Sequence, residues 1–307
     1  MRLEQYQDIW INGAVDTPGI RECANRYEHI RAIAAQYERP FTVLDVGANL
    51  GYFSIRLTED FPNCRVVAIE HLYSKWLIDV LAANNTYRIV LLDHQFTVDD
   101  LKRLGEVEHF DMVLAMSVMH HFDQDWGSIL AAFRQLGDVL IAETAHEQAA
   151  CGRNITETCE VPADAELLAL FPSHLDGSPR PMWTTSQPRT TLAKAYLDTP
   201  MNDCNIRIEA DNRSKQAVKG KKRYDWFPGI NLHTWLRWGG SWPERHEVAE
   251  MVRESAPAKR HGDIRTHNVI LSGDATHFID AADPRRAMDD DAESLHRLLL
   301  EIDGRSV

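Results

Sequence analysis

The stretch LDVGANLGYFS, residues 44–54, places a carboxylate and two glycines where an apolar run ends. Asp45 can accept hydrogen bonds from an ammonium or amide group, whereas Gly47 and Gly51 let the backbone turn tightly and approach a ligand that a Cβ atom would block. Position 49 is Asn, so this is not a dinucleotide fingerprint, and no Lys-Ser or Lys-Thr pair follows as in a phosphate-binding loop. These residue types predict a site for a ligand with a cationic amino-acid end.

The elements around this loop follow an alternating pattern. Five β-rich apolar runs cover residues 41–46, 65–70, 88–93, 110–116 and 138–144. Helical patterns lie between them, and one more precedes them at about 21–37. The helix after the second run has an apolar face that we expect to be buried, formed by Trp76, Leu77, Val80 and Leu81. Apolar strands alternating with helices predict a doubly wound, mostly parallel α/β sheet, whose ligand binds beyond the carboxyl ends of the strands.

The loop and the strand ends together resemble the class I S-adenosylmethionine-dependent methyltransferases, and DVGANLGYFS is most similar to the loop of FkbM-type O-methyltransferases. The resemblance covers about residues 20–145 and implies a Rossmann-like sheet with S-adenosyl-L-methionine as its cofactor. It implies that Glu70, which ends the second strand, binds the ribose hydroxyls and that Asp93, after the third, lies beside the adenine. Other positions that it places around the cofactor are Arg26, Asn49, Tyr52, His71, His94 and Ser117.

For three of these residues a purely structural interpretation stays open. Glu70 is alternatively a solvated charge at a strand end, and Asp93 alternatively caps a helix or turn. Arg26 would pair with the methionine carboxylate of the cofactor, but an exposed helix face explains it equally well.

Methyl transfer to a hydroxyl requires alignment of the acceptor with the methyl group, and usually the removal of a proton. The loop MSVMHHF, residues 116–122, contains His120 and His121, and an imidazole suits the role of base because its pKa lies near neutrality. HHFDQDW is similar to the His-Asp-Trp stretch of plant-type small-molecule O-methyltransferases. We expect His120 to be the base, with a pair that only shapes the pocket as the alternative. Glu143 and His146 are further candidates for contact with the acceptor.

A second motif lies near the C-terminus. HGDIRTHN, residues 261–268, with Asp280 further on, resembles the catalytic loop of aminoglycoside-phosphotransferase-like kinases. The resemblance implies that Asp263 orients an acceptor hydroxyl and that Asn268 and Asp280 bind magnesium. No glycine-rich nucleotide loop precedes it, and Lys194 is the one faint match to the strand lysine of kinases. A degenerate kinase-like or unrelated extension is therefore the favoured interpretation.

Composition limits the possible partners. The formal net charge of −13 disfavours nucleic acid and anionic membranes, and no apolar run reaches the roughly 18 residues of a membrane span. Five scattered cysteines without a C-x-x-C pair indicate a reducing compartment and no zinc site. We therefore expect a cytoplasmic enzyme that takes no metal and acts on a small-molecule acceptor; the sequence does not specify its oligomeric state.

The sequence predicts three parts. These are an N-terminal helical segment over the cofactor site at 1–40, a methyltransferase domain at 41–200 and a C-terminal α+β extension at 201–307. The favoured function is O-methylation of a small-molecule or saccharide hydroxyl. N-methylation, a bifunctional methyltransferase with a kinase-like C-terminal part, and a non-catalytic cofactor-binding module stay open. The basic run at 213–223 either meets an anionic acceptor or is a solvated loop.

Overall fold

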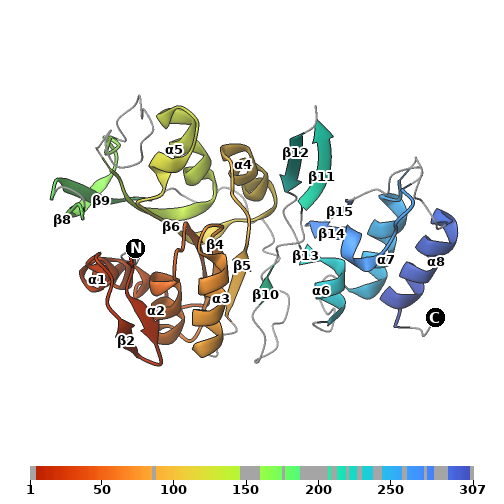
Figure 1. Ribbon diagram of the computed structural model, residues 1–307, viewed down its shortest axis with the longest axis horizontal. Coiled ribbons are helices and arrows are strands. Elements are labelled where there is room, and N and C mark those ends of the chain that lie inside the picture. Colours follow the sequence, from red (N-terminus) through yellow and green to blue (C-terminus); the bar gives the residue numbers. More distant parts are fainter. Residues whose placement is uncertain are drawn as a thin grey trace. The chain divides into compact units, whose positions relative to one another are not determined.

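The structure, a computed structural model, describes residues 5–84, 88–145, 160–174, 177–186, 207–208, 213–218, 221–226, 230–237, 244–257, 261–272, 275–279 and 290–304. The chain divides into two compact units (Figure 1). Unit 1 comprises Met1–Gly105, His109–Leu192 and Asp203–Ile208, and unit 2 comprises Glu106–Glu108, Ala193–Asn202 and Glu209–Val307. Within the described ranges, no helix is both long and apolar enough to cross a membrane.

Unit 1 is built on an eight-stranded sheet with the order β10-β5-β4-β3-β6-β7-β9-β8. The strands are β3 (Phe41–Val46), β4 (Cys64–Ile69), β5 (Ile89–Leu92), β6 (Phe110–Met116), β7 (Gly137–Glu143), β8 (Glu166–Pro172), β9 (Pro179–Ser186) and β10 (Arg207–Ile208). All pair in parallel except β9, which runs antiparallel to both β7 and β8. The order reverses between β3 and β6, where a doubly wound sheet binds its ligand. The predicted fold class is confirmed.

Helices cover both faces of this sheet. One side carries α1 (Cys23–Ala34), α2 (Tyr52–Asp60) and α3 (Ser74–Ala83), and the other carries α4 (Val98–Val107) and α5 (Trp126–Gln135) (Figure 1). Every residue of β6 is buried as a result. Leu77 and Leu81 of α3 are buried as predicted, but the prediction for Trp76 was wrong, because its ring is 56% exposed and lies against Tyr73.

An N-terminal hairpin, β1 (Ile9–Ile11) with β2 (Ala14–Thr17), packs against α2 and α3. The Trp10 indole donates a hydrogen bond to Glu59 at the end of α2, with 2.6 Å between nitrogen and oxygen. Between the hairpin and α1 the chain passes very close to itself. A Cβ atom on Gly19 would lie 2.3 Å from the carbonyl carbon of Gln7, so only glycine fits there. This crossing fixes the segment that leads to Arg21.

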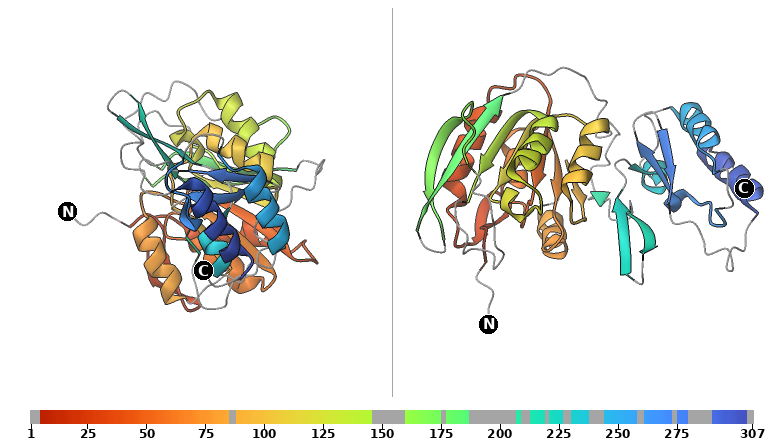
Figure 2. Two further views of the ribbon diagram at one scale, coloured as in Figure 1. Left: turned by 90° about the vertical axis from the view of Figure 1, so that its right-hand side faces the viewer. Right: turned by 90° about the horizontal axis from the view of Figure 1, so that it is seen from above.

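The β8–β9 hairpin extends the sheet beyond β7. Figure 2 shows it in green at one edge of the sheet. Met182 and Trp183 of β9 are fully buried, whereas Leu167 and Leu170 of β8 are exposed. The hairpin is therefore held on one face by the core, and its first β9 residues reach the carboxyl end of β7, where Met182 is opposite Glu143.

Unit 2 is a smaller α+β structure. Its strands are β11 (Arg213–Val218), β12 (Lys221–Trp226), β13 (Ile230–Asn231), β14 (Val269–Ser272) and β15 (Ala275–Phe278), and its helices are α6 (Leu232–Arg237), α7 (Arg245–Glu254) and α8 (Asp291–Ile302). Strands β11 and β12 pair in the antiparallel direction, so the described residues of the basic run, 213–218 and 221–223, lie in strands and not in an irregular loop. Strands β13, β14 and β15 form a separate antiparallel sheet against which α6 and α7 pack. Helix α8 buries Leu298 and Ile302, as their spacing predicts.

The core of unit 1 gives a direct test of this packing. Leu101 of α4 is fully buried, whereas Leu72 is 79% exposed. We expect Leu101→Ala to lower the free energy of unfolding by about 2–5 kcal/mol because it leaves a cavity, and Leu72→Ala to change it by less than about 0.5 kcal/mol. Urea unfolding followed by circular dichroism measures both; equal, small effects would contradict the described packing of α4.

Candidate functional site

The loop after β3 begins at a buried carboxylate. Asp45 is 1% exposed, and its Oδ2 accepts a hydrogen bond of 2.6 Å from the Ser54 hydroxyl at the start of α2. Burial raises the pKa of Asp45 to about 6, although the Ser54 hydrogen bond acts in the opposite direction. A cationic group that approached this carboxylate would favour its charged form. Asp45 is thus suited to a ligand that carries an ammonium group.

Two glycines shape the same loop. Gly47 and Gly51 have φ angles of +73° and +77°. A Cβ atom would meet Val118 Cγ2 at 2.6 Å from the first position and Leu77 Cδ1 at 2.7 Å from the second. Asn49 between them also has a left-handed backbone, with φ +54°, a conformation that costs free energy in any residue but glycine. The loop is therefore held in one conformation by its surroundings.

Glu70 holds this loop against the end of β4. Its Oε2 accepts a hydrogen bond from the Asn49 amide at 2.8 Å, and its Oε1 accepts from the amides of His71 and Tyr73 at 2.8 and 3.0 Å. Glu70 is only 8% exposed, so the alternative of a solvated strand-end charge is wrong. An ionised carboxylate has about four lone-pair positions, so these three bonds leave capacity for a ligand hydroxyl.

The remaining cofactor candidates lie in two places. Asp93, after β5, has its Oδ1 3.5 Å from His71 Nδ1, and the two side chains are 26% and 45% exposed. His94 is nearly buried and its Nε2 lies 3.6 Å from Asp100 Oδ2. Tyr52, in contrast, is fully buried and packs edge-on to Trp10. Asp93 and His71 are accessible at the ligand-binding edge, while Tyr52 supports the N-terminal hairpin.

The loop after β6 contains the predicted base. Ser117 has φ +60° and donates a hydrogen bond of 2.5 Å to Glu143 Oε1. His120 is half-buried, its Nδ1 is buried without a hydrogen-bond partner, and its ring lies 4.1 Å from that of the exposed His121. Burial, followed by the charges of His121 and Arg180, lowers the pKa of His120 to about 3. His120 is therefore a neutral imidazole across the physiological pH range.

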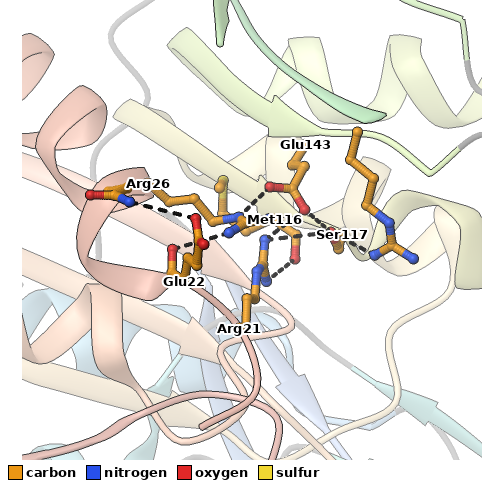
Figure 3. A network of polar contacts seen from close by, with 8 residues as sticks. Arg21, Glu22, Arg26, Met116, Ser117 and Glu143 are labelled. Atoms are coloured by element: carbon orange, nitrogen blue, oxygen red, sulfur yellow. Dashed lines mark hydrogen bonds and ion pairs between the residues drawn. The ribbon is translucent and has the colours of Figure 1, made fainter. Parts of the chain in front are cut away.

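Glu143, at the end of β7, joins three parts of the chain (Figure 3). Its Oε2 accepts from Arg26 Nε at 2.5 Å, and its Oε1 accepts from Arg21 Nη2 at 3.0 Å and from the Ser117 hydroxyl. Burial alone would raise the pKa of Glu143, but Arg21 and Arg26 hold it below its ordinary value. Arg26 is only 2% exposed, so the alternative of an exposed helix face is wrong.

Sequence reasoning missed two arginines of this site. Arg21 lies in the segment before α1 and is 5% exposed; Arg180, at the start of β9, is 3% exposed. Arg21 also donates to the Met116 carbonyl oxygen at 3.4 Å (Figure 3). Neither arginine belongs to a motif: Arg180 stands between two prolines, and Arg21 follows Ile20 and precedes Glu22. His146, the remaining acceptor candidate, lies outside the described residues.

The kinase-like segment of unit 2 has its own contacts. The Asn268 side chain donates to the carbonyl oxygen and to Oδ2 of Asp263 at 2.9 and 3.0 Å. Arg265 Nε lies 2.8 Å from Asp263 Oδ1. Asp280 and Lys194 lie outside the described residues. The predicted Asp263–Asn268 pair is thus adjacent, while its roles stay predictions.

The strand order and the loop geometry agree with the enzyme class that a comparison with known protein families indicates. Residues 43–140 match a family model described as a methyltransferase domain. The match covers β3 to β7, the strands that surround the switch point. The protein therefore has the Rossmann-like α/β fold of a class I methyltransferase. It is a methyltransferase enzyme whose cofactor is S-adenosylmethionine.

Solved structures extend the comparison along the chain. The bifunctional kinase-methyltransferase WbdD superposes with a TM-score of 0.50 at 17% identity, over 91% of this chain and 80% of that chain. A second WbdD structure gives 0.50 at 16% identity, over 98% and 85%. The N-terminal domain of EvdMO1 with SAH bound gives 0.45 at 12% identity, over 61% and 92%. At these identities the WbdD likeness shows the fold alone. A search of curated proteins found no match.

The Glu143 network predicts a pH-dependent stability. Glu143→Gln leaves Arg21 and Arg26 buried without a countercharge, so we expect the free energy of unfolding at pH 7 to fall by about 3–5 kcal/mol. Because the folded-state pKa of Glu143 is depressed, its stabilisation is present above its ordinary pKa of 4.5 and is lost as the pH falls through the folded value.

Denaturant unfolding at several pH values measures this difference, with Glu166→Gln on the exposed face of β8 as the matched control. The wild type and Glu143→Gln should converge below about pH 4.5, whereas Glu166→Gln should follow the wild type throughout. Equal stability of Glu143→Gln and wild type at pH 7 would contradict the buried ion pairs.

Proposed function

We propose that this enzyme is an O-methyltransferase that acts on the hydroxyl group of a small molecule, with a saccharide as the favoured acceptor. The observation that carries the proposal is His120. It follows β6 at the switch point of the sheet, its Nδ1 is buried without a partner, and it is neutral at physiological pH. A neutral imidazole has one unprotonated ring nitrogen, and this nitrogen can accept the proton of an acceptor hydroxyl.

The cofactor would be held along the carboxyl ends of β3, β4 and β5. Asp45 supplies a carboxylate for the ammonium group, Glu70 has about one lone pair left for a ribose hydroxyl, and Asp93 is accessible for the adenine amino group. When bound, S-adenosylmethionine supplies a methyl group on a sulfonium, which a hydroxyl oxygen can attack in line.

His120 would then accept the proton of the acceptor hydroxyl as the hydroxyl oxygen bonds to the methyl carbon and the bond from that carbon to sulfur breaks, with S-adenosylhomocysteine as the leaving group. The low pKa of His120 keeps it in the base form, but it also makes the base weak. Proton transfer to such a weak base therefore occurs late in the reaction. By then the hydroxyl oxygen is already bonding to the methyl carbon, and its proton has become strongly acidic. Ser117, held by Glu143, orients the loop that carries the imidazole.

The saccharide acceptor rests on the FkbM-like loop, and N-methylation is the alternative at the same site. A bifunctional enzyme is a further alternative, which the adjacency of Asp263 and Asn268 keeps open. The similar structure WbdD is described as a bifunctional kinase-methyltransferase. Binding of ATP with magnesium to unit 2 is what separates this alternative from a structural extension.

Cofactor binding gives the first test. Calorimetric titration of the wild type with S-adenosylhomocysteine should show saturable binding, which Asp45→Ala and Glu70→Ala each weaken by more than about tenfold, as loss of a charged hydrogen-bond partner predicts. Asp138→Ala, at the amino end of β7 and half-exposed, is the matched control and should leave the affinity unchanged. Absence of binding to pure wild-type protein would overturn the assignment of the site.

The role of His120 gives the second test. His120→Gln should lower turnover by about 10²–10⁴-fold, because a positioned base contributes that much, and should leave cofactor affinity within about threefold. His121→Gln, whose ring is exposed, is the matched control and should do much less. Methyl transfer from labelled S-adenosylmethionine to a panel of neutral and acidic saccharides measures both variants. Equal, small losses would show that the pair only shapes the pocket.

A further inference from the structure

A cavity of about 90 Å³ lies beside the Glu143 network. It is lined by the segment before α1, by α1 itself, by the end of β8 with the two residues that follow it and by the start of β9, and its polar lining includes Tyr6, Arg21, Arg26, His174 and Arg180. Since one water needs about 10–15 Å³ of such space, the cavity has room for several waters or for one oxyanion group. Its walls come from elements outside the strands that form the cofactor site.

The cavity carries an excess of buried positive charge. Arg21, Arg26 and Arg180 are each at most 5% exposed, and among the described residues Glu143 is the buried carboxylate that pairs with Arg21 and Arg26. Glu22 also lines the cavity, but its side chain is exposed, and the contact it makes is with Asn25. Three guanidinium groups therefore face one buried carboxylate.

Arg180 has no carboxylate partner among the residues that the structure describes. Its single hydrogen bond among the described residues runs from Nη1 to the Ser117 hydroxyl oxygen at 3.5 Å, the limit of such a contact, and its Nε is buried without a partner. A guanidinium has five N–H donors, and a buried charge that lacks partners costs free energy. Arg21 Nε is likewise buried without a partner. The unused donors of both arginines are what an oxyanion would satisfy.

The field of these arginines reaches the methyl-transfer site. Arg180 and Arg21 both contribute to lowering the pKa of His120, after burial and His121. The same two arginines lower the pKa of His174 on the cavity wall, where burial is the largest cause. A group bound to Arg180 would thus lie within electrostatic range of the proposed base.

We propose that this cavity binds an oxyanion of the acceptor, a phosphate or a carboxylate, through Arg180 and Arg21, and so positions the neighbouring hydroxyl beside His120. The inference rests on the proposed methyltransferase function and names the class of its substrate as an acidic one. Arg26 keeps its role as the partner of Glu143. Planar guanidinium groups bind such oxyanions in a fixed orientation, so the anion selects both the acceptor and its direction.

The test is calorimetric titration with inorganic phosphate, and separately with acetate, at constant ionic strength set by sodium chloride. Each titration is run with and without saturating S-adenosylhomocysteine, so anion binding is scored even if the cofactor does not bind. We expect saturable binding of at least one anion to the wild type, and the better of the two identifies phosphate or carboxylate as the recognised group.

Three variants assign that binding to Arg180. Arg180→Met should weaken anion binding by at least about tenfold. Arg180→Lys, which keeps the charge but loses the planar set of N–H donors, should weaken it by about threefold. Arg31→Met, on the exposed side of α1, is the matched control and should not change it. Because Arg180→Met leaves no described carboxylate without its partner, the variant should fold and should bind S-adenosylhomocysteine as the wild type does.

Two results would overturn the proposal while leaving the methyltransferase function intact. One is wild-type protein that binds S-adenosylhomocysteine but neither anion. The other is Arg180→Met that keeps anion affinity, or that loses affinity for S-adenosylhomocysteine instead, which would assign Arg180 to the carboxylate of the cofactor. Anion binding without binding of S-adenosylhomocysteine would instead retain the anion site and overturn the proposed function.

Discussion

A single buried carboxylate holds the site together. Glu143 is fully buried and binds Arg21, Arg26 and the Ser117 hydroxyl, so it joins the segment before α1, helix α1 and the end of β6 to the end of β7. Each of these contacts involves the charged Glu143 carboxylate at a buried position, where hydrogen bonds are strong and their loss costs free energy. The conformation of the loop that carries His120 and the closure of the N-terminal segment both depend on it.

The features that can be predicted from the sequence depend on local contacts, whereas those that cannot depend on contacts between residues far apart in the chain. The bounds of β3 and β6 follow from the sequence because an apolar β-rich run between polar turns has few alternatives. The glycine loop is also local. Arg21 and Arg26 meet Glu143 across 122 and 117 residues, so no periodicity connects them. A buried arginine looks like a solvated one in sequence, and its burial depends on tertiary contacts alone.

Strain and charge serve the same region. Asn49 and Ser117 have left-handed backbones at the ends of neighbouring strands, β3 and β6, and Gly47 would clash with Val118 if it had a Cβ atom. Such conformations persist when the surroundings over-determine them, which Glu70 and Glu143 do here by hydrogen bonds to Asn49 and Ser117. Burial is the largest cause of the low pKa of His120, and Arg180 and Arg21, which make the cavity positive, lower that pKa as well. Changing one of them therefore alters the binding of an anion and the basicity of the imidazole together.

The β8–β9 hairpin can change in evolution independently of the loops after β3, β4 and β5. It is attached to the sheet through β7 alone, and it contributes Arg180 and His174 to the cavity but no residue to the loops after β3, β4 and β5. Substitutions, insertions or exchange of its turn can therefore accumulate without disturbing the parallel strands. Under the proposed role of Arg180, descendants of such a chain can acquire new acceptors through changes in this one hairpin, while the loops proposed for the cofactor stay unchanged.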